Sequence, residues 1–187
     1  MLDRKNAEII LHPIPTSDPN DPLNWPKWWK AVNFSLVCLY TLLVFVNVDI
    51  GTVVWAELNS ELGIPWASLS NSFGINTAAL AIGCVLFIPF ALKFGRRPVY
   101  LFSTVVSTLT AVWQAKMRNT GDLYGSMIVS GLAGSIAETI CQMTIADMFF
   151  VHQRGTANGV YLLLVNVGAF LGPVAAGYSA AAQGWRW

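Results

Sequence analysis

Charged residues are scarce in this chain of 187 residues, and their scarcity is its first informative feature. Lysine, arginine, aspartate and glutamate make up 11% of the sequence, against about a quarter in a typical soluble domain. Apolar residues make up 55%. This composition excludes an ordinary soluble domain and gives no support to nucleic-acid binding. It is typical of a membrane protein, with the lipid bilayer as its main surroundings.

Cysteine and histidine are also few. The three cysteines, Cys38, Cys84 and Cys141, each lie within a long apolar run and show no paired spacing, which argues against a disulfide framework or a metal site. The two histidines, His12 and His152, lie outside these runs. Since no Ser/His pair, paired aspartates or HExxH motif falls in an apolar run, we expect neither an enzyme nor a cofactor.

The apolar residues form long runs that are almost free of charge. A helix that crosses a bilayer needs about 20 predominantly apolar residues. The sequence therefore predicts an all-α membrane protein in which residues 30–187 form a helical bundle. About five transmembrane helices are expected, at residues 31–54, 70–92, 98–117, 122–147 and 156–182.

A proline-rich segment of about 29 residues precedes the first apolar run, and it contains five of the nine prolines. Proline fixes its own φ and lacks a backbone donor, so we expect a tail without regular structure. The tail ends in an aromatic and basic collar, which is typical of a helix end at the headgroup level. The collar consists of Trp25, Lys27, Trp28, Trp29 and Lys30.

The distribution of basic residues predicts the orientation. If the N-terminus is cytoplasmic, eight of the eleven lysines and arginines fall in cytoplasmic segments. This bias follows the positive-inside rule. We expect a multi-pass protein with a cytoplasmic N-terminus, in the plasma membrane rather than the vacuolar or another membrane.

One predicted helix carries a polar face. Gly131, Gly134, Ser135, Glu138 and Gln142 follow steps of three and four, which places them on one side of the span at 122–147. An ionised side chain near the middle of a span costs at least ~2.5 kcal/mol on insertion scales, so Glu138 is a functional candidate. The alternative is a protonated structural glutamate that is hydrogen-bonded by Gln142.

A weaker pair of polar candidates lies near the end of the first predicted span. Asn47 and Asp49 are two residues apart there, and Asp49 is close enough to the interface to extend into it. The candidates for substrate or proton binding are therefore Glu138, Gln142, Asp49 and Asn47.

The stretch "FALKFGRRPVYL" places three bases in a short turn between two apolar runs. Lys93, Arg96 and Arg97 surround Gly95, and this number of bases exceeds what topology alone requires. The last predicted helix contains a second distinctive stretch, "GAFLGPVAAG". Its small residues permit close helix packing and its proline favours a kink. The residues concerned are Gly168, Gly172, Pro173 and Gly177.

These segments resemble the major facilitator superfamily. "FALKFGRRPVYL" is similar to its loop between helices two and three, "ADMFFVHQRG" to its helix 4–5 junction, and "GAFLGPVAAG" to its fifth-helix antiporter motif. With "DPNDPLNWPKWWK" and "QGWRW", they resemble the fungal twelve-span drug:proton antiporter group from about Asp18 to the last residue.

The resemblance implies roles for the basic turn and for the last predicted helix. Gly95 would permit the tight turn, and Arg96 and Arg97 would form a cytoplasmic gating network with Asp147. Lys93 and Arg154 would be further members. The alternative is that these bases are solvated markers of topology. The glycines and Pro173 would govern packing and bending of the fifth helix during transport.

Three positions depart from the family pattern. Ile88 stands where the family commonly has glycine, Leu92 where it has aspartate, and Met127 where it has an arginine often linked to proton transfer. The network therefore lacks one carboxylate. Proton coupling through Glu138 or Asp49 is a hypothesis from the residues alone.

The resemblance implies a transporter of small organic molecules that works by alternating access and is linked to protons. Such a transporter has two six-helix halves with the substrate between them. We expect the chain to be the N-terminal portion, truncated before helix six, and non-functional or partial without the missing C-terminal half or another subunit. The alternative is a truncated, assembly or dominant-negative membrane protein with no transport of its own.

Overall fold

The structure, a computed structural model, describes residues 21–184. These residues form helices and turns and contain no strand, which confirms the predicted all-α fold. Residues 1–20, most of the predicted tail, lie outside the described part. The elements are η1 (Pro22–Asn24), α1 (Lys27–Ile50), α2 (Trp55–Leu62), α3 (Trp66–Phe94), α4 (Arg96–Ala115), α5 (Thr120–Met148) and α6 (Val151–Gln183).

Four helices in the described part of the chain are long and apolar enough to cross a membrane: α1, α3, α5 and α6. Helix α4 has the length of a span but is less apolar, and it begins with two arginines and contains five serines and threonines. Thr104 and Thr108 donate hydrogen bonds to the carbonyls four residues before them, and Ser103 donates to the carbonyl of Ala133 on α5 at 2.9 Å. Internal satisfaction of this kind is what a bilayer requires, so α4 as the fifth span stays our prediction.

The end of the first helix differs from the sequence expectation. Helix α1 ends at Ile50 rather than at residue 54, because Thr52 turns back and donates to the carbonyl of Asp49 from both its backbone and its hydroxyl. The short helix α2 follows, and the sequence analysis did not predict it. Gly63, with φ of +65°, ends α2 in a conformation that favours glycine.

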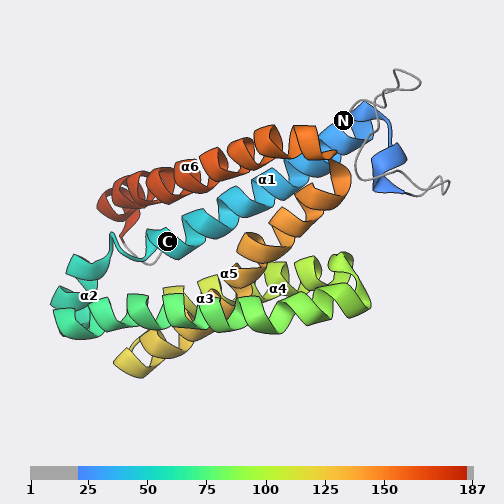
Figure 1. The fold of residues 1–187 in the computed structure, drawn as a ribbon. Helices are drawn as coiled ribbons and strands as arrows, with labels where there is room; N and C mark the ends of the chain where they lie inside the picture. The colour runs from blue at the N-terminus through green and yellow to red at the C-terminus, as the bar shows by residue number, and fades with distance from the viewer. Residues whose placement is uncertain (1–20, 185–187) are drawn as a thin grey trace, which may run out of the picture.

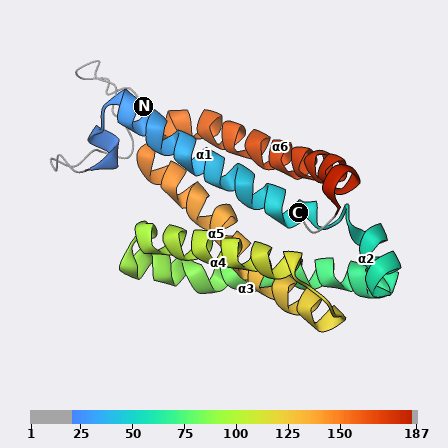
Figure 2. The same ribbon diagram turned by 180° about the vertical axis from the view of Figure 1, so that it is seen from behind.

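The helices are arranged around α5. Helices α1 and α6 lie side by side, α3 and α4 lie on the other side of the bundle and pack mainly against α5, and α5 crosses obliquely between the two groups (Figures 1 and 2). Helix α5 contacts α1, α3, α4 and α6, and it holds more buried residues than any other helix. The bundle has a basic end, where α3 meets α4 and α5 meets α6, and an opposite end that carries α2.

The seam between α3 and α5 depends on small residues. A Cβ atom on Gly131 would lie 2.3 Å from the backbone oxygen of Asn76, and one on Gly83 would meet the side chain of Ser135. The Asn76 amide donates a hydrogen bond of 2.9 Å to the carbonyl of Met127. Small residues that let backbones approach, supported by interhelical hydrogen bonds, are typical of membrane helix packing.

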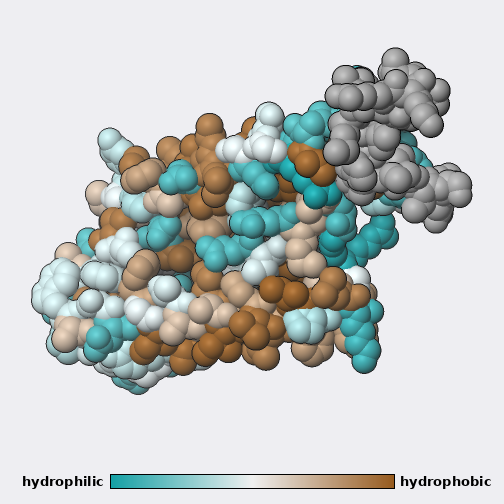
Figure 3. All heavy atoms as spheres, viewed as in Figure 1, coloured by the Kyte–Doolittle hydropathy of each residue, from teal (hydrophilic) through white to brown (hydrophobic). Residues whose placement is uncertain are grey.

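The surface is largely apolar. Figure 3 shows broad hydrophobic areas over the helices, with hydrophilic residues gathered at the end where the chain begins and in the middle of this face. Large apolar side chains such as Val85, Leu101 and Phe170 are exposed. A soluble monomer rarely exposes so much apolar surface, whereas lipid-facing helices do.

The start of α1 carries the predicted aromatic and basic collar. Trp28 and Trp29 are exposed and form an edge-to-face pair with centroids 5.4 Å apart. The Lys30 ammonium donates to the carbonyl of Leu23 and lies 5.2 Å from the ring centroid of Phe150 on the α5–α6 junction. The anchoring role of this collar stays a prediction.

The Gly131 seam gives a test of the fold. We expect Gly131→Ala to lower the free energy of unfolding by about 1–3 kcal/mol, because the new methyl group forces α3 away from α5. Gly74→Ala on α3 is the matched control, since a Cβ there meets nothing within 4 Å. The measurement is the thermal unfolding midpoint of each purified variant in the same detergent. Equal midpoints for both variants would contradict this account of the seam.

Candidate functional site

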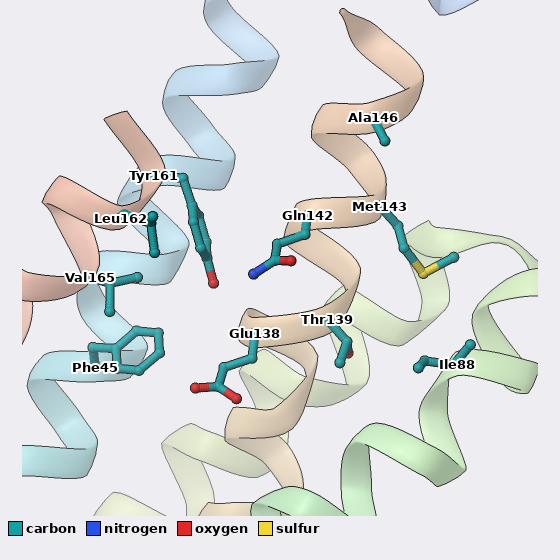
Figure 4. Close-up of a pocket in the computed structure, with 10 residues that line it drawn as sticks. All are labelled: Phe45, Ile88, Glu138, Thr139, Gln142, Met143, Ala146, Tyr161, Leu162 and Val165. Carbon is teal, nitrogen blue, oxygen red and sulfur yellow. The ribbon is translucent and has the colours of Figure 1, made fainter. Parts of the chain in front are cut away.

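A groove of about 630 Å³ lies beside α5, and four helices line it (Figure 4). It runs along α5 from Glu138 toward the basic end of the bundle. Helix α5 contributes most of the lining, α6 adds one wall, and α1 and α3 contribute one residue each. The lining residues are Phe45, Ile88, Glu138, Thr139, Gln142, Met143, Ala146, Tyr161, Leu162 and Val165.

The structure brings Glu138 and Gln142 together in this groove. Both side chains project from α5 into it, one helical turn apart (Figure 4). Glu138 is half-buried, and no hydrogen bond or ion pair to its carboxylate is found among the described residues. A half-buried carboxylate with no partner in the described part of the chain is available to bind a cation or a proton.

The phenol of Tyr161 forms part of the opposite wall, and the sequence analysis missed it. Tyr161 is 3% exposed, and its hydroxyl donates a hydrogen bond of 3.1 Å to the carbonyl of Ala137, the residue before Glu138. Figure 4 shows this hydroxyl directed toward the side of α5 that carries Gln142. Its spacing of seven residues from Gly168 places it on the face of α6 that packs inward, which was the available signal.

The second polar pair does not join this groove. Asn47 lines a separate cavity of about 610 Å³ at the opposite end, where the ends of α1, α4 and α6 meet α2. Asp49 lines neither cavity. The structure therefore does not assemble Asn47 and Asp49 with Glu138 into one site.

At the basic end, Arg96 forms an ion pair with Asp147. Arg96 is the first residue of α4, and Asp147 lies in the last turn of α5. The two side chains are 26% and 54% exposed, so the pair is partly solvated. Gly95, with φ of +85°, allows the sharp reversal between α3 and α4 that directs Arg96 toward α5.

The other bases of this turn lie apart from the ion pair. Lys93 and Arg97 are exposed, and neither forms an ion pair with a described residue. The Lys93 ammonium lies 5.4 Å from the ring centroid of Phe94.

Arg154 contacts carbonyl oxygens rather than a carboxylate. Its guanidinium donates hydrogen bonds to the carbonyls of Ala146 and Phe149 at the end of α5. The last carbonyls of a helix have no intrahelical partners and carry partial negative charge, so a cation stabilises them. Arg154 therefore caps α5 beside the turn that holds Asp147.

The glycines of α6 face α1. A Cβ on Gly168 would lie 2.9 Å from the carbonyl oxygen of Leu42, and one on Gly172 would lie 3.1 Å from the backbone of Val46. Gly177 has more room, with its nearest neighbour 3.8 Å away. Pro173 lies inside α6 directly after this contact. Gly168 and Gly172 thus bring the backbones of α1 and α6 into close contact.

The three departures from the family pattern have different surroundings. Met127 is 7% exposed and packs in the apolar cluster that contains Leu58 and Leu69. Ile88 lines the Glu138 groove, and Leu92 is 70% exposed. An apolar side chain thus fills the space at position 127, where the family commonly has arginine.

Comparison with known proteins identifies the family. Residues 34–187 match the Major Facilitator Superfamily. An uncharacterized MFS-type transporter of Schizosaccharomyces pombe is 36% identical over 98% of the chain, and protein HOL1 of Saccharomyces cerevisiae is 32% identical over 100% of it. Polyamine transporter 4 of the same yeast is 30% identical over 91%.

The chain spans 32% of the length of each of the first two relatives and 26% of the third. The family consists of integral membrane proteins that transport small molecules, which agrees with the apolar helices. Membership of a family of transporters also confirms the expectation that the chain is not an enzyme. The resemblance drawn from the basic turn, the helix 4–5 junction and the glycine motif is thereby confirmed. This chain belongs to the Major Facilitator Superfamily.

Proposed function

We propose that this chain forms one wall of the substrate path in a transporter that works by alternating access. The observation that carries the proposal is the groove in which Glu138 has no described partner. Transporters of this architecture hold substrate near the bilayer midplane between two halves. The second half, or another subunit, supplies the facing wall.

The chemistry of the groove favours an organic cation or a protonatable amine as substrate. A carboxylate, an amide and a phenol offer acceptors to ammonium groups, and Phe45 offers an aromatic face. The similarity to a relative named for polyamine transport is consistent with this class. Drug-like neutral molecules, siderophores and other metabolites are the competing substrates.

Glu138 is also our candidate for proton coupling. A carboxylate that exchanges a proton for a cationic substrate links the two fluxes at one site. Met127 supports this choice indirectly, because its apolar surroundings leave no second charged group at the position often linked to proton transfer. Asp49 lies in neither cavity and is the weaker candidate.

The basic end is proposed as the cytoplasmic gate. Arg96 and Asp147 tie the start of α4 to the end of α5, and Arg154 caps the same end of α5. This arrangement would hold the cytoplasmic side closed until substrate or proton binding breaks the ion pair. The positive-inside bias supports a cytoplasmic N-terminus, and we propose the plasma membrane as the location.

The groove proposal gives a binding test. We expect Glu138→Gln to weaken binding of radiolabelled spermidine at least about tenfold, because a charge-assisted hydrogen bond is lost. Binding is measured by scintillation proximity on the purified chain in detergent. Glu61→Gln, on the exposed side of α2, is the matched control and should bind as the unchanged chain does. Equal binding by both variants would reject Glu138 as the cation site.

Proton coupling needs a separate experiment. In a transporter that contains this segment, Glu138→Gln should remove the pH dependence of transport while Glu61→Gln retains it. An unchanged pH dependence would exclude Glu138 as the coupling group. Saturable accumulation by the 187-residue chain alone would show that no second half is needed, whereas binding without accumulation fits the proposed wall.

The gate proposal predicts a difference between stability and transport. Asp147→Asn should change the free energy of unfolding by less than about 1 kcal/mol, because the ion pair is partly solvated. It should nevertheless alter transport, and exchange of the two charges by Arg96→Asp with Asp147→Arg should restore it. Lys116→Gln at the opposite end is the control. Normal transport by Asp147→Asn would reject the gate.

A further inference from the structure

An apolar groove, here called the outer groove, lies on the outside of the bundle, between α3 and α4 at the basic end. Its volume is about 460 Å³, and all six residues that line it are apolar. Two pairs of rings shape it: Phe87 with Phe102, at a centroid distance of 5.9 Å, and Phe90 with Phe94, at 6.0 Å. Pro98 and Val99 complete the lining.

The residue types argue against a helix as the occupant. Where helices of this chain meet closely, glycine or another small residue lets one backbone approach the other, as at Gly131 against Asn76 and Gly168 against Leu42. The outer groove contains no glycine, alanine or serine. Four bulky rings hold a neighbouring helix at a distance, but they leave a channel into which a flexible hydrocarbon chain fits.

Basic side chains stand at one end of this groove. Lys93 places its ammonium 5.4 Å from the centroid of Phe94, which lines the groove. Arg97 directly precedes Pro98, which lines the groove, and is exposed. Asp147, at the neighbouring end of α5, pairs with Arg96, and neither Lys93 nor Arg97 forms an ion pair with a described residue.

We propose that this groove binds one acyl chain of an anionic phospholipid whose headgroup contacts Lys93 and Arg97. Phe87 and Phe94 are seven residues apart along α3, so the groove extends about 10 Å from the headgroup level into the leaflet. The placement in the cytoplasmic leaflet rests on the orientation in the proposed function, and this leaflet is the one rich in anionic lipid. The lipid site itself depends on neither Glu138 nor the gate.

The test uses photoactivatable lipids. The 187-residue chain is placed in nanodiscs that contain phosphatidylserine or phosphatidylcholine with a diazirine on the acyl chain, and the labelled peptides are mapped by mass spectrometry. We expect phosphatidylserine to label residues 87–102 more than phosphatidylcholine does. Lys93 and Arg97 should each contribute a factor of about five to this preference. Equal labelling by the two lipids would overturn the proposal.

Variants separate headgroup recognition from general lipid contact. Lys93→Gln with Arg97→Gln should remove the preference for phosphatidylserine, whereas Lys93→Arg with Arg97→Lys, which keeps both charges, should retain it. Lys116→Gln with Arg118→Gln, at the opposite end, is the matched control. A preference that survives loss of Lys93 and Arg97, or that disappears in the control, would refute the site.

One further outcome identifies a different occupant. A photo-crosslinking amino acid in place of Phe90 should give lipid adducts in native membranes. A discrete protein adduct at that position, with no lipid adduct, would show that a helix of a partner or of a second half covers the groove and would overturn the proposal. Because this readout requires neither substrate binding nor transport, its failure is distinct from failure of the proposed function.

Discussion

The close approach of α5 to its neighbours is the constraint on which the rest of the structure depends. At Gly131 the backbones of α3 and α5 come so near that even a methyl group would collide with the carbonyl of Asn76. That contact sets the rotation of α5, and Glu138, two turns further along, then faces the groove. Because the hydrophobic effect does not drive helices together within lipid, close packing of this kind has to stabilise the bundle.

The same helix separates two uses of charge. In the middle of the bundle Glu138 has no described partner, whereas at the basic end Asp147 and Arg96 are paired and Arg154 satisfies the carbonyls of α5. An ion pair at the partly solvated end gains little stability and can be broken at small cost. A lone carboxylate at depth instead depends on a cation or a proton for neutralisation. The positions of the charges thus match the proposed roles, which are a gate at the basic end and a binding site in the middle of the bundle.

Much of this was predictable from the sequence. Long charge-free runs gave the positions of the main helices, and the basic turn and glycine motif identified the family. The pairing of Arg96 with Asp147 followed from the family resemblance, because the two residues are far apart in sequence. Short helix α2 was missed, since its eight residues are too few to cross a bilayer and include two glutamates, so they read as a polar connection between two spans. The hydrogen bonds of Arg154 and Tyr161 were missed because both go to backbone carbonyls, and the spacing of Tyr161 from Gly168 indicates only that it faces inward.

Helix α6 is held at two places along its length, by Tyr161 and by the glycine motif. In its first half α6 is tied to α5 by the hydrogen bond from the Tyr161 hydroxyl to the carbonyl of Ala137. Further along it is held against α1 by Gly168 and Gly172. Pro173 has no N–H to donate to the carbonyl of Ala169, so it weakens the turn between Gly168 and Pro173. We expect a bend in this turn to leave the groove end of α6 in place and to move the end that lines the cavity beside Asn47. The motif named for antiport would then act on access from the opposite end, while the residues around Glu138 keep their geometry.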